Sequence, residues 1–384
     1  MISITDKSSC CGCSACQAIC PHDAIVMLPD GMGFQYPVVN LERCVDCGLC
    51  EKVCDFTKDC KVESTRPEMN VYAARHKDMH TLSRSQSGGA FTAISDVVLK
   101  AGGVVYGAAF DQDLSVRHSR AVTAEERNLF CGSKYIQSRM EDTFRSVLID
   151  LKSGRQVLFS GTPCQVAGLK SYVPERYMGS IVFLDLVCHG VPSPAVWKSY
   201  LKDMERHGTI IGACFRDKSL MGWKGHKESF AYSNGSTRTG ETFRVLFHKN
   251  IMLRPSCGSC NYDINNRYSD LSIADFWGID AICPQMDGNA GTSMIVVHTE
   301  KGRKLLAEAA VHLDIHQVSA DISRLAQRNP NLLAPTNLHP ESEEFEKAFI
   351  KRGFMYVAAR WGDRGWRYKA WQIKCSLRKL LGKK

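Results

Sequence analysis

The feature that most constrains the fold of this chain is a cysteine pattern that occurs twice near its N-terminus. Both copies space their cysteines as C-x2-C-x2-C-x3-C, and a proline, Pro21, follows only the first. The first copy contains Cys10, Cys13, Cys16 and Cys20, and the second contains Cys44, Cys47, Cys50 and Cys54. Such short spacings let one tight loop supply three thiolates to a 4Fe-4S cubane, while the fourth thiolate comes from the other copy.

The repeat therefore predicts two clusters with exchanged ligands. We expect one cluster on Cys10, Cys13, Cys16 and Cys54, and the other on Cys44, Cys47, Cys50 and Cys20. The alternative is a pair of zinc knuckles, but zinc sites take four ligands in two pairs and need no group of three close thiolates. Exchanged ligands hold two clusters close together, which suits transfer of single electrons. Cys11 and Cys60 fall outside the pattern, and Asp55 stands where the first copy has proline.

Composition limits the class and location of the protein. The chain has 384 residues and 18 cysteines, nine of them within the first 54 positions. We expect no signal peptide and no spanning helix, because MISITDKSSCCG has no apolar core and the longest apolar run is interrupted by Asp185. Free thiols fit a reducing cytoplasm. Cluster charges would reduce the formal net charge of +9 to roughly +3, so net charge gives no reason to expect nucleic-acid binding.

The sequence predicts an α+β protein in four parts. Residues 1–60 form a small ferredoxin-like dicluster domain, residues 61–70 a polar linker, residues 71–350 a larger mixed α/β domain, and residues 351–384 a basic tail. We expect strands in VVYGAAF, QVLFSG, IVFLDLVC, TFRVLFHK and MIVVHT, and helices near residues 90–100, 194–206 and 300–311.

Four cysteines of the larger domain form a candidate third metal site. Cys164 and Cys188 each follow an apolar, strand-like run, and Cys257 and Cys260 form a C-x2-C pair. The ends of neighbouring strands in an α/β sheet lie along one edge, where loops form sites. We hypothesise a 4Fe-4S cluster on these four thiolates. A zinc site on the same residues remains an alternative, as does simple packing of Cys164 and Cys188. Packing is also our interpretation of Cys131, Cys214, Cys283 and Cys375.

Several longer motifs resemble the beta subunit family of coenzyme F-420 hydrogenases and dehydrogenases. They are SQSGGAFTAI (85–94), CGSKYIQS (131–138), GTPCQVAGLK (161–170), DLVCHGVPSPAVW (185–197), CGSCNYDINNRYSDLSIADFWG (257–278) and GTSMIVVHTEKG (291–302). The resemblance implies an iron-sulfur flavoprotein oxidoreductase with FAD in the larger domain beside a 4Fe-4S cluster. A flavin takes electrons singly and releases them as a pair.

The matched motifs supply candidate flavin contacts. Ser87 is expected to cap a helix whose first turn contains Gly88 and Gly89, which leaves backbone N–H groups free for a phosphate or a flavin edge. Lys134 is expected near the pyrimidine edge of the flavin, and Thr162 beside either flavin or cluster. Asp275 is a candidate for ribityl or ribose hydroxyls. Ordinary capping, turn and solvated roles compete with each of these assignments, and no catalytic residue is identified.

The C-terminal segment is basic and aromatic. Trp366, Ala370, Ile373, Leu377 and Leu381 recur at helical spacing, with Arg367, Lys374, Arg378 and Lys379 off that stripe. Such a helix suits peripheral contact with an anionic membrane or an acidic partner. The alternative is a terminal helix packed on the domain.

Together these features predict a cytoplasmic oxidoreductase. Electrons would pass between a redox partner protein or small-molecule donor, the ferredoxin-type clusters, the third cluster and FAD. The flavin would exchange hydride with a deazaflavin coenzyme or another organic acceptor. The alternatives are a non-catalytic subunit that delivers electrons to a partner enzyme, and a partner-binding protein whose clusters are structural. The sequence determines neither the substrate, the direction of electron flow nor the oligomeric state.

Overall fold

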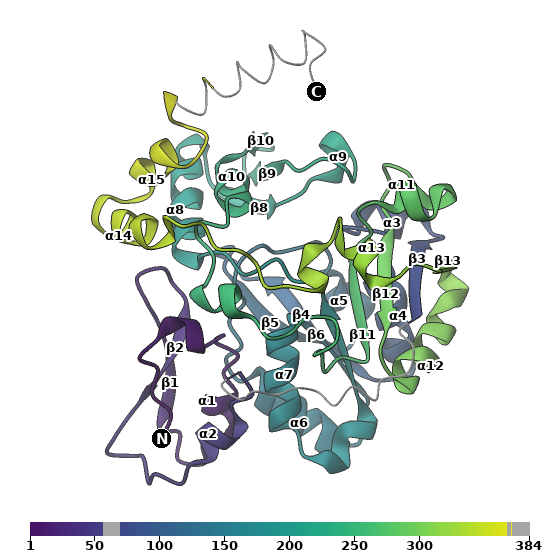
Figure 1. Cartoon of the computed structure of the whole chain (residues 1–384), viewed down its shortest axis with the longest axis horizontal. Helices are drawn as coiled ribbons and strands as arrows, with labels where there is room; N and C mark the ends of the chain where they lie inside the picture. Colours follow the sequence, from purple (N-terminus) through teal and green to yellow (C-terminus); the bar gives the residue numbers. More distant parts are fainter. Residues whose placement is uncertain (57–69, 367–369, 371–384) are drawn as a thin grey trace.

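The computed structural model describes residues 1–56, 70–366 and 370 (Figure 1). In this part of the chain, three sheets organise the fold: a two-stranded hairpin near the N-terminus, a three-stranded antiparallel sheet and an eight-stranded mixed sheet. The hairpin and the three-stranded sheet lie on either side of one end of the large sheet in Figure 1. The α+β class is confirmed. Cys60 and Cys375 lie outside the described residues, as do Ile373, Leu377 and Leu381 of the predicted amphipathic stripe.

The N-terminal module, residues 1–56, repeats one small unit. Its two helices have five residues each and both follow a residue in the left-handed region, Ser14 (φ 65°) and Gly48 (φ 72°). Its elements are α1 (Ala15–Ile19), β1 (Ile25–Pro29), β2 (Gln35–Val39) and α2 (Leu49–Val53). The strands pair antiparallel with Ile25 opposite Val39. The buried Cys16 and Cys50 share one apolar cluster, so both cysteine loops close on a common core.

The large sheet has a parallel centre and antiparallel edges. Its strand order is β13-β3-β12-β11-β7-β6-β4-β5, and the parallel pairs are β11 with β7, β7 with β6, and β6 with β4. The strands are β3 (Asn70–His76), β4 (Val104–Phe110), β5 (Val116–Ala121), β6 (Val157–Gly161), β7 (Ile181–Leu186), β11 (Leu271–Asp275), β12 (Ser293–Val297) and β13 (Leu313–Val318). Because β6 and β7 are parallel neighbours, the segments that follow them, with Cys164 and Cys188, leave the sheet at one edge.

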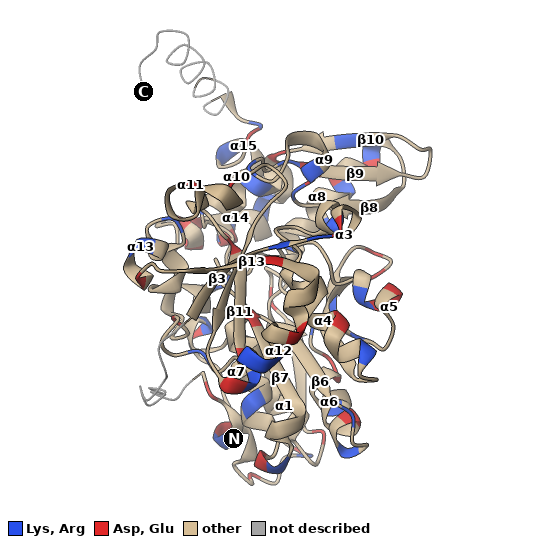
Figure 2. Ribbon diagram, turned by 90° about the vertical axis from the view of Figure 1, so that its right-hand side faces the viewer, with Lys and Arg blue, Asp and Glu red and all other residues tan. Residues whose placement is uncertain are grey.

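Helices cover both faces of this sheet because its strands alternate apolar side chains on the two sides. Val105 and Leu158 belong to a cluster with Ile94 of α4, whereas Tyr106 and Phe159 belong to another on the face of α6 and α7. These helices and their neighbours are α3 (Met79–Arg84), α4 (Ala90–Lys100), α5 (Ala124–Asn128), α6 (Thr143–Lys152), α7 (Pro163–Tyr172), α11 (Ile279–Ile282), α12 (Glu300–Ala309) and α13 (Ile322–Ala326). Figure 2 shows positions of Lys and Arg interspersed along the ribbon with positions of Asp and Glu.

The three-stranded sheet forms a lobe with an aromatic core. Trp197, Tyr200, Phe243 and Phe354 are all buried in one cluster. The lobe contains α8 (Pro194–Met204), β8 (Ile210–Cys214), α9 (Lys218–Met221), β9 (Glu228–Tyr232), β10 (Thr237–Gly240), α10 (Thr242–His248), α14 (Ser342–Arg352) and α15 (Phe354–Arg360). The predicted boundary at residue 350 falls inside α14, and the buried Trp361 still belongs to the core, so packing continues past that boundary.

Most of the expected helices and strands are present, but one segment predicted as a strand is a helix. Helices at 90–100, 194–204 and 300–309 and strands at 104–110, 157–161, 181–186 and 293–297 match the expectations. TFRVLFHK was predicted as a strand but forms α10. Its buried Phe243, Leu246 and Phe247 recur at helical spacing, which its β-favouring composition concealed. No helix in the described ranges is both long and apolar enough to span a bilayer.

Candidate functional site

Two small cavities in the N-terminal module are bordered by the cysteines in the exchanged arrangement. The first site is the cavity of about 20 Å³ lined by Cys10, Cys13, Cys16 and Cys54. The second site is a cavity of the same size lined by Cys20, Cys44, Cys47 and Cys50. Each cavity thus takes three cysteines from one sequence copy and the fourth from the other. This placement fits the ligand exchange predicted from the spacing.

Backbone N–H groups point at sulfur in the second site. The amide of Ile2 lies 3.3 Å from Cys50 Sγ, and the amide of Ala24 lies 3.4 Å from Cys20 Sγ. Donors to sulfur stabilise thiolate charge and help to set the potential of an iron-sulfur cluster. The donor chemistry therefore fits a cluster at this site.

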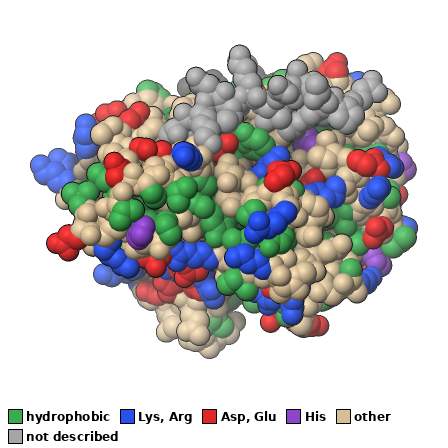
Figure 3. Space-filling model, turned by 90° about the horizontal axis from the view of Figure 1, so that it is seen from below, with side chains coloured by type: hydrophobic (Ala, Val, Ile, Leu, Met, Phe, Trp, Pro, Cys, Tyr) green, Lys and Arg blue, Asp and Glu red, His purple; other side chains and the backbone are tan. Residues whose placement is uncertain are grey.

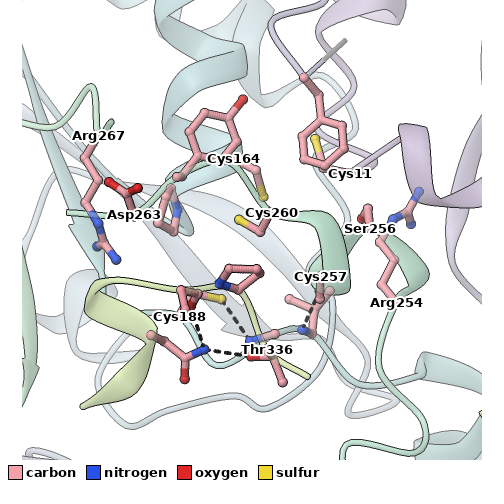
Figure 4. Close-up of a pocket in the computed structure, with 18 residues that line it drawn as sticks. Cys11, Cys164, Cys188, Arg254, Ser256, Cys257, Cys260, Asp263, Arg267 and Thr336 are labelled. Atoms are coloured by element: carbon pink, nitrogen blue, oxygen red, sulfur yellow. Dashed lines mark hydrogen bonds between the residues drawn. The ribbon is translucent and has the colours of Figure 1, made fainter. Parts of the chain in front are cut away.

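A third cavity lies at the carboxyl edge of the parallel strands. The third site, of about 50 Å³, is lined by Cys164, Cys188, Cys257 and Cys260, and Figure 4 shows these side chains around a common space. Cys164 lies in the first turn of α7, Cys188 follows β7, and Cys257 and Cys260 belong to the turn that begins at Pro255. The structure thus brings together four thiols from three segments that are far apart in the sequence.

Backbone amides also point at sulfur in the third site. The amides of Gly190 and Val191 each lie 3.4 Å from sulfur, that of Cys188 and that of Cys257 respectively. Four thiols with amide donors suit a 4Fe-4S cluster.

Cys11 connects the first and third sites. It is buried and lines both cavities, as does Phe56. Its thiol neighbours Cys13 of the first site and Cys164 of the third, and its presence lowers the pKa of Cys13 and lowers that of Cys164 to about 7. Cys11 is not part of the repeated cysteine pattern, and its place between the two sites gives it a separate role.

A large cavity of about 520 Å³ adjoins the third site. Cys188, Gly190, Val191 and Asn331 line both spaces. The volume lies within the range of cofactor and ligand pockets, roughly 300–1,000 Å³. Of the residues predicted to contact a flavin, Ser87, Gly89, Lys134, Thr162 and Asp275 line this cavity.

The segment before α4 differs from the expectation. Ser87 does not cap the helix: its hydroxyl donates to the Thr292 carbonyl at 2.8 Å, and the N-cap is Gly89 at φ 85°. Gly88 faces the sheet, because its amide donates to Ser293 Oγ at 2.9 Å. A Cβ on Gly88 would lie 2.2 Å from the Ala74 carbonyl oxygen. Gly88 is therefore required for close packing and does not line the cavity.

Lys134 and Thr162 both line the large cavity, but they contact different groups. The Lys134 ammonium donates to the carbonyls of Leu129 and Cys131 at 2.7 and 2.9 Å, and burial lowers its pKa to about 8. Thr162 Oγ1 lies 3.2 Å from Cys164 Sγ. Thr162 therefore lies between the large cavity and a thiol of the third site.

Asp275 and four histidines, His118, His189, His226 and His248, form part of the polar wall of the large cavity. Asp275 is paired with the buried Arg216 and accepts from Trp223 Nε1 at 2.8 Å. Burial lowers the pKa of His118 to about 4, that of His226 to about 3 and that of His248 to about 4. These imidazoles are neutral near pH 7 and present uncharged polar rings to the cavity.

The sequence analysis missed several residues of these sites. It gave no role to Cys11, to Arg254, which lines the third site, or to His118, His226 and His248, because their positions depend on how distant segments pack together. Asp55 was noted only as a departure from proline. The structure gives that departure a reason, because the buried Asp55 accepts hydrogen bonds from Tyr262 at 2.9 Å and Tyr268 at 3.2 Å.

Comparison with known protein families agrees with both halves of this description. Residues 9–57 match the family described as 4Fe-4S dicluster domain. Residues 154–321 match the family described as the C terminus of the coenzyme F420 hydrogenase/dehydrogenase beta subunit. The fold and its cysteine sites thus define an iron-sulfur electron-transfer oxidoreductase. The chain thus carries, over residues 154–321, the C-terminal domain of the coenzyme F420 hydrogenase/dehydrogenase beta subunit family and, over residues 9–57, a 4Fe-4S dicluster domain.

A solved structure shares the fold. A chain of the F420-reducing [NiFe] hydrogenase complex from Methanosarcina barkeri superposes with a TM-score of 0.50 at 18% sequence identity, covering 68% of this chain and 88% of that chain. A short stretch of the chain also resembles a curated protein. Over 48 residues it is 44% identical to a subunit of the Na(+)-translocating ferredoxin:NAD(+) oxidoreductase complex of Acetobacterium woodii. That match covers 12% of this chain and 13% of the relative.

Proposed function

We propose that this protein passes electrons between three 4Fe-4S clusters and a flavin that exchanges hydride with an organic donor or acceptor. The observation that carries the proposal is the succession of shared cavity walls. Cys11 and Phe56 border both the first and third sites, and Cys188 borders both the third site and the large cavity. Single residues therefore separate consecutive sites, a spacing that suits electron transfer from one to the next.

The residues of the third site have defined tasks in this proposal. Cys164, Cys188, Cys257 and Cys260 would hold the cluster. The amides of Gly190 and Val191 would stabilise charge on the sulfurs of Cys188 and Cys257. Gly190 adopts φ 114°, which favours glycine, and this conformation presents its amide to sulfur.

The large cavity would hold FAD. When bound, this cofactor takes up electrons singly and exchanges them as a hydride. Lys134 would place a positive charge beside it, held in position by two carbonyl oxygens. Thr162 would separate it from Cys164, and Gly89 would leave the start of α4 open to it. Asp275 is occupied by Arg216 and Trp223, so it would orient these two residues more readily than bind a ribityl hydroxyl directly.

The second site is the entrance for electrons in this scheme. Cys47 is exposed, and so are six apolar side chains of the same module. These are Val26, Leu28, Val38, Leu41, Val45 and Leu49. Apolar side chains gather on this side of the molecule in Figure 3. Exposed apolar patches mark protein contacts, which supports a redox partner protein here in the reducing cytoplasm.

The same patch favours a second candidate function, in which the chain delivers electrons to a partner enzyme and binds no substrate of its own. Both functions need the same clusters and flavin. They differ in whether the purified chain turns over a small organic acceptor, for example a deazaflavin, without any other protein. Turnover by the single chain supports the oxidoreductase, and dependence on a co-purifying protein supports the delivery subunit.

Reductive titration tests the common core of the proposal. Three clusters that take one electron each and a flavin that takes two should consume about five electron equivalents per chain. We expect anaerobic dithionite titration of the intact protein, followed by visible absorbance and EPR, to reach this value. Consumption of about two equivalents without flavin bleaching would contradict the proposal.

A further inference from the structure

Arg254 occupies an unusual position between the first and third sites. It is fully buried, with 0% of its surface exposed, and it lies three positions before Cys257 of the third site. Its side chain extends toward the first site, where Nε donates to the Cys10 carbonyl at 2.8 Å and Nη2 lies 3.6 Å from Cys10 Sγ. Figure 4 shows Arg254 at the border of the third site.

The other partners of the Arg254 guanidinium are uncharged. Nη1 donates to Gln137 Oε1 at 2.9 Å, Nη2 donates to the Gln35 carbonyl at 3.0 Å, and the ring of Tyr36 lies 4.2 Å away. No carboxylate among the described residues forms an ion pair with it. Three other arginines are buried, and each has an acid: Arg127 with Asp96, Arg216 with Asp275, and Arg267 with Asp185.

A buried cation without an acid needs another source of negative charge. The desolvation penalty of such an ion is several kcal/mol even after the surroundings relax, and buried charges are therefore paired or act with metal centres. Arg254 Nη2 lies 3.6 Å from the Cys10 thiol of the first site, and Arg254 also lines the cavity of the third site.

We propose that Arg254 is a buried counter-ion shared by the first and third sites, and that its charge makes both clusters easier to reduce. A 4Fe-4S cluster held by four thiolates is already negative, and reduction adds one more negative charge. A fixed positive charge stabilises the reduced form more than the oxidised form. The second site is not lined by Arg254 and serves as an internal reference. The inference rests on the cluster proposed for the third site.

An EPR-monitored redox titration of the full-length, anaerobically purified protein tests this role. In Arg254→Gln, which removes the charge but keeps hydrogen-bonding groups, two of the three cluster reductions should become less favourable. The expected change is at least tenfold in the equilibrium constant of each, or about 59 mV for one electron. The reduction potential of the cluster in the second site should stay unchanged. Arg254→Lys should keep all three near the wild-type values.

The matched control is Gln137→Leu, which removes one hydrogen bond to Arg254 and leaves the charge in place. We expect the equilibrium constant of each cluster reduction in this variant to stay within about twofold of the wild-type value. This change is far smaller than the one expected when the charge of Arg254 is removed. Unchanged reductions in Arg254→Gln, or equal shifts in Arg254→Gln and Arg254→Lys, would overturn the inference. Equal shifts would mean that the shape and bonding of the guanidinium matter, and not its charge.

Iron content keeps the inference testable if Arg254→Gln fails to retain clusters. If Arg254→Lys retains the iron that Arg254→Gln loses, the charge is required; equal losses overturn the inference. Failure of the third cluster is recognised separately, because the wild-type protein would then show two cluster reductions and about eight iron atoms. If the wild-type protein shows three cluster reductions and Arg254→Gln leaves all three unchanged, the counter-ion role of Arg254 is refuted while the third cluster stands.

Discussion

The hydroxyl of Tyr262 donates a 2.9 Å hydrogen bond to Asp55, 207 positions earlier in the chain. This bond fastens the end of the N-terminal module to the turn that carries Cys257 and Cys260. Tyr268 donates to the other oxygen of the same carboxylate. Because Cys54 precedes Asp55 directly, the attachment also fixes a cysteine of the first site relative to the third.

Tyr262→Phe should loosen the N-terminal module. The substitution removes one hydrogen bond to a buried carboxylate, which corresponds to a loss of about 1–3 kcal/mol in the free energy of unfolding. Urea unfolding followed by iron-sulfur absorbance measures the loss, and hydrogen exchange over residues 44–56 locates it. Tyr356→Phe, in α15 and far from the module, is the control. Equal behaviour of the two variants would argue against this attachment.

The exchange of ligands between the two N-terminal sites predicts a pattern of non-additive losses. Cys10→Ala and Cys54→Ala should each remove the first cluster, about four iron atoms. The double variant should lose no more than either single variant. Cys54→Ala combined with Cys44→Ala should instead lose about eight iron atoms, because Cys44 lines the second site. If Cys54 paired with Cys44, these two double variants would exchange their results.

Gly88→Ala should destabilise the large domain. The added Cβ would lie 2.2 Å from the Ala74 carbonyl oxygen and 2.5 Å from the Ser293 amide nitrogen, both backbone atoms that cannot move independently. Overpacking of this kind reduces the free energy of unfolding by about 1–3 kcal/mol. Gly179→Ala, where no atom lies within 4 Å of the added Cβ, is the control in the same urea titration. Equal midpoints for the two variants would contradict the packing role of Gly88.

Stability should fall on acidification below pH 6.5, in part through His118. Burial lowers the pKa of His118 from 6.5 to about 4. The unfolded chain therefore binds a proton that the folded protein excludes over this range, and stability decreases as the pH falls from 6.5 to about 4. His118→Gln should reduce the slope by up to about 1.4 kcal/mol per pH unit. Urea midpoints at several pH values measure it, with the exposed His80→Gln as control; an unchanged slope in His118→Gln would contradict this cause.

More of the cysteine sites than of the rest of the molecule could be predicted from the sequence. Ligand spacing is a local property, so the grouping of Cys20 with Cys44 follows from the repeat. Cys164 and Cys188 could be paired because strand ends of neighbouring parallel strands share one edge. Arg254 and Cys10 could not be paired in advance, since their contact depends on how the N-terminal module docks. Ser87 was wrongly predicted to cap a helix, because its hydroxyl instead donates a hydrogen bond to the carbonyl of Thr292, a residue distant in the sequence.

The central claim is that a third inorganic cluster lies between the N-terminal clusters and the large cavity. The most direct measurement is the content of iron, acid-labile sulfide and zinc in anaerobically purified full-length protein. The account predicts about twelve iron and twelve sulfide per chain. It also predicts that Cys257→Ser lowers both to about eight, while Cys283→Ser, at a buried cysteine outside the three sites, leaves them unchanged. About eight iron with one zinc in the wild-type protein would contradict it.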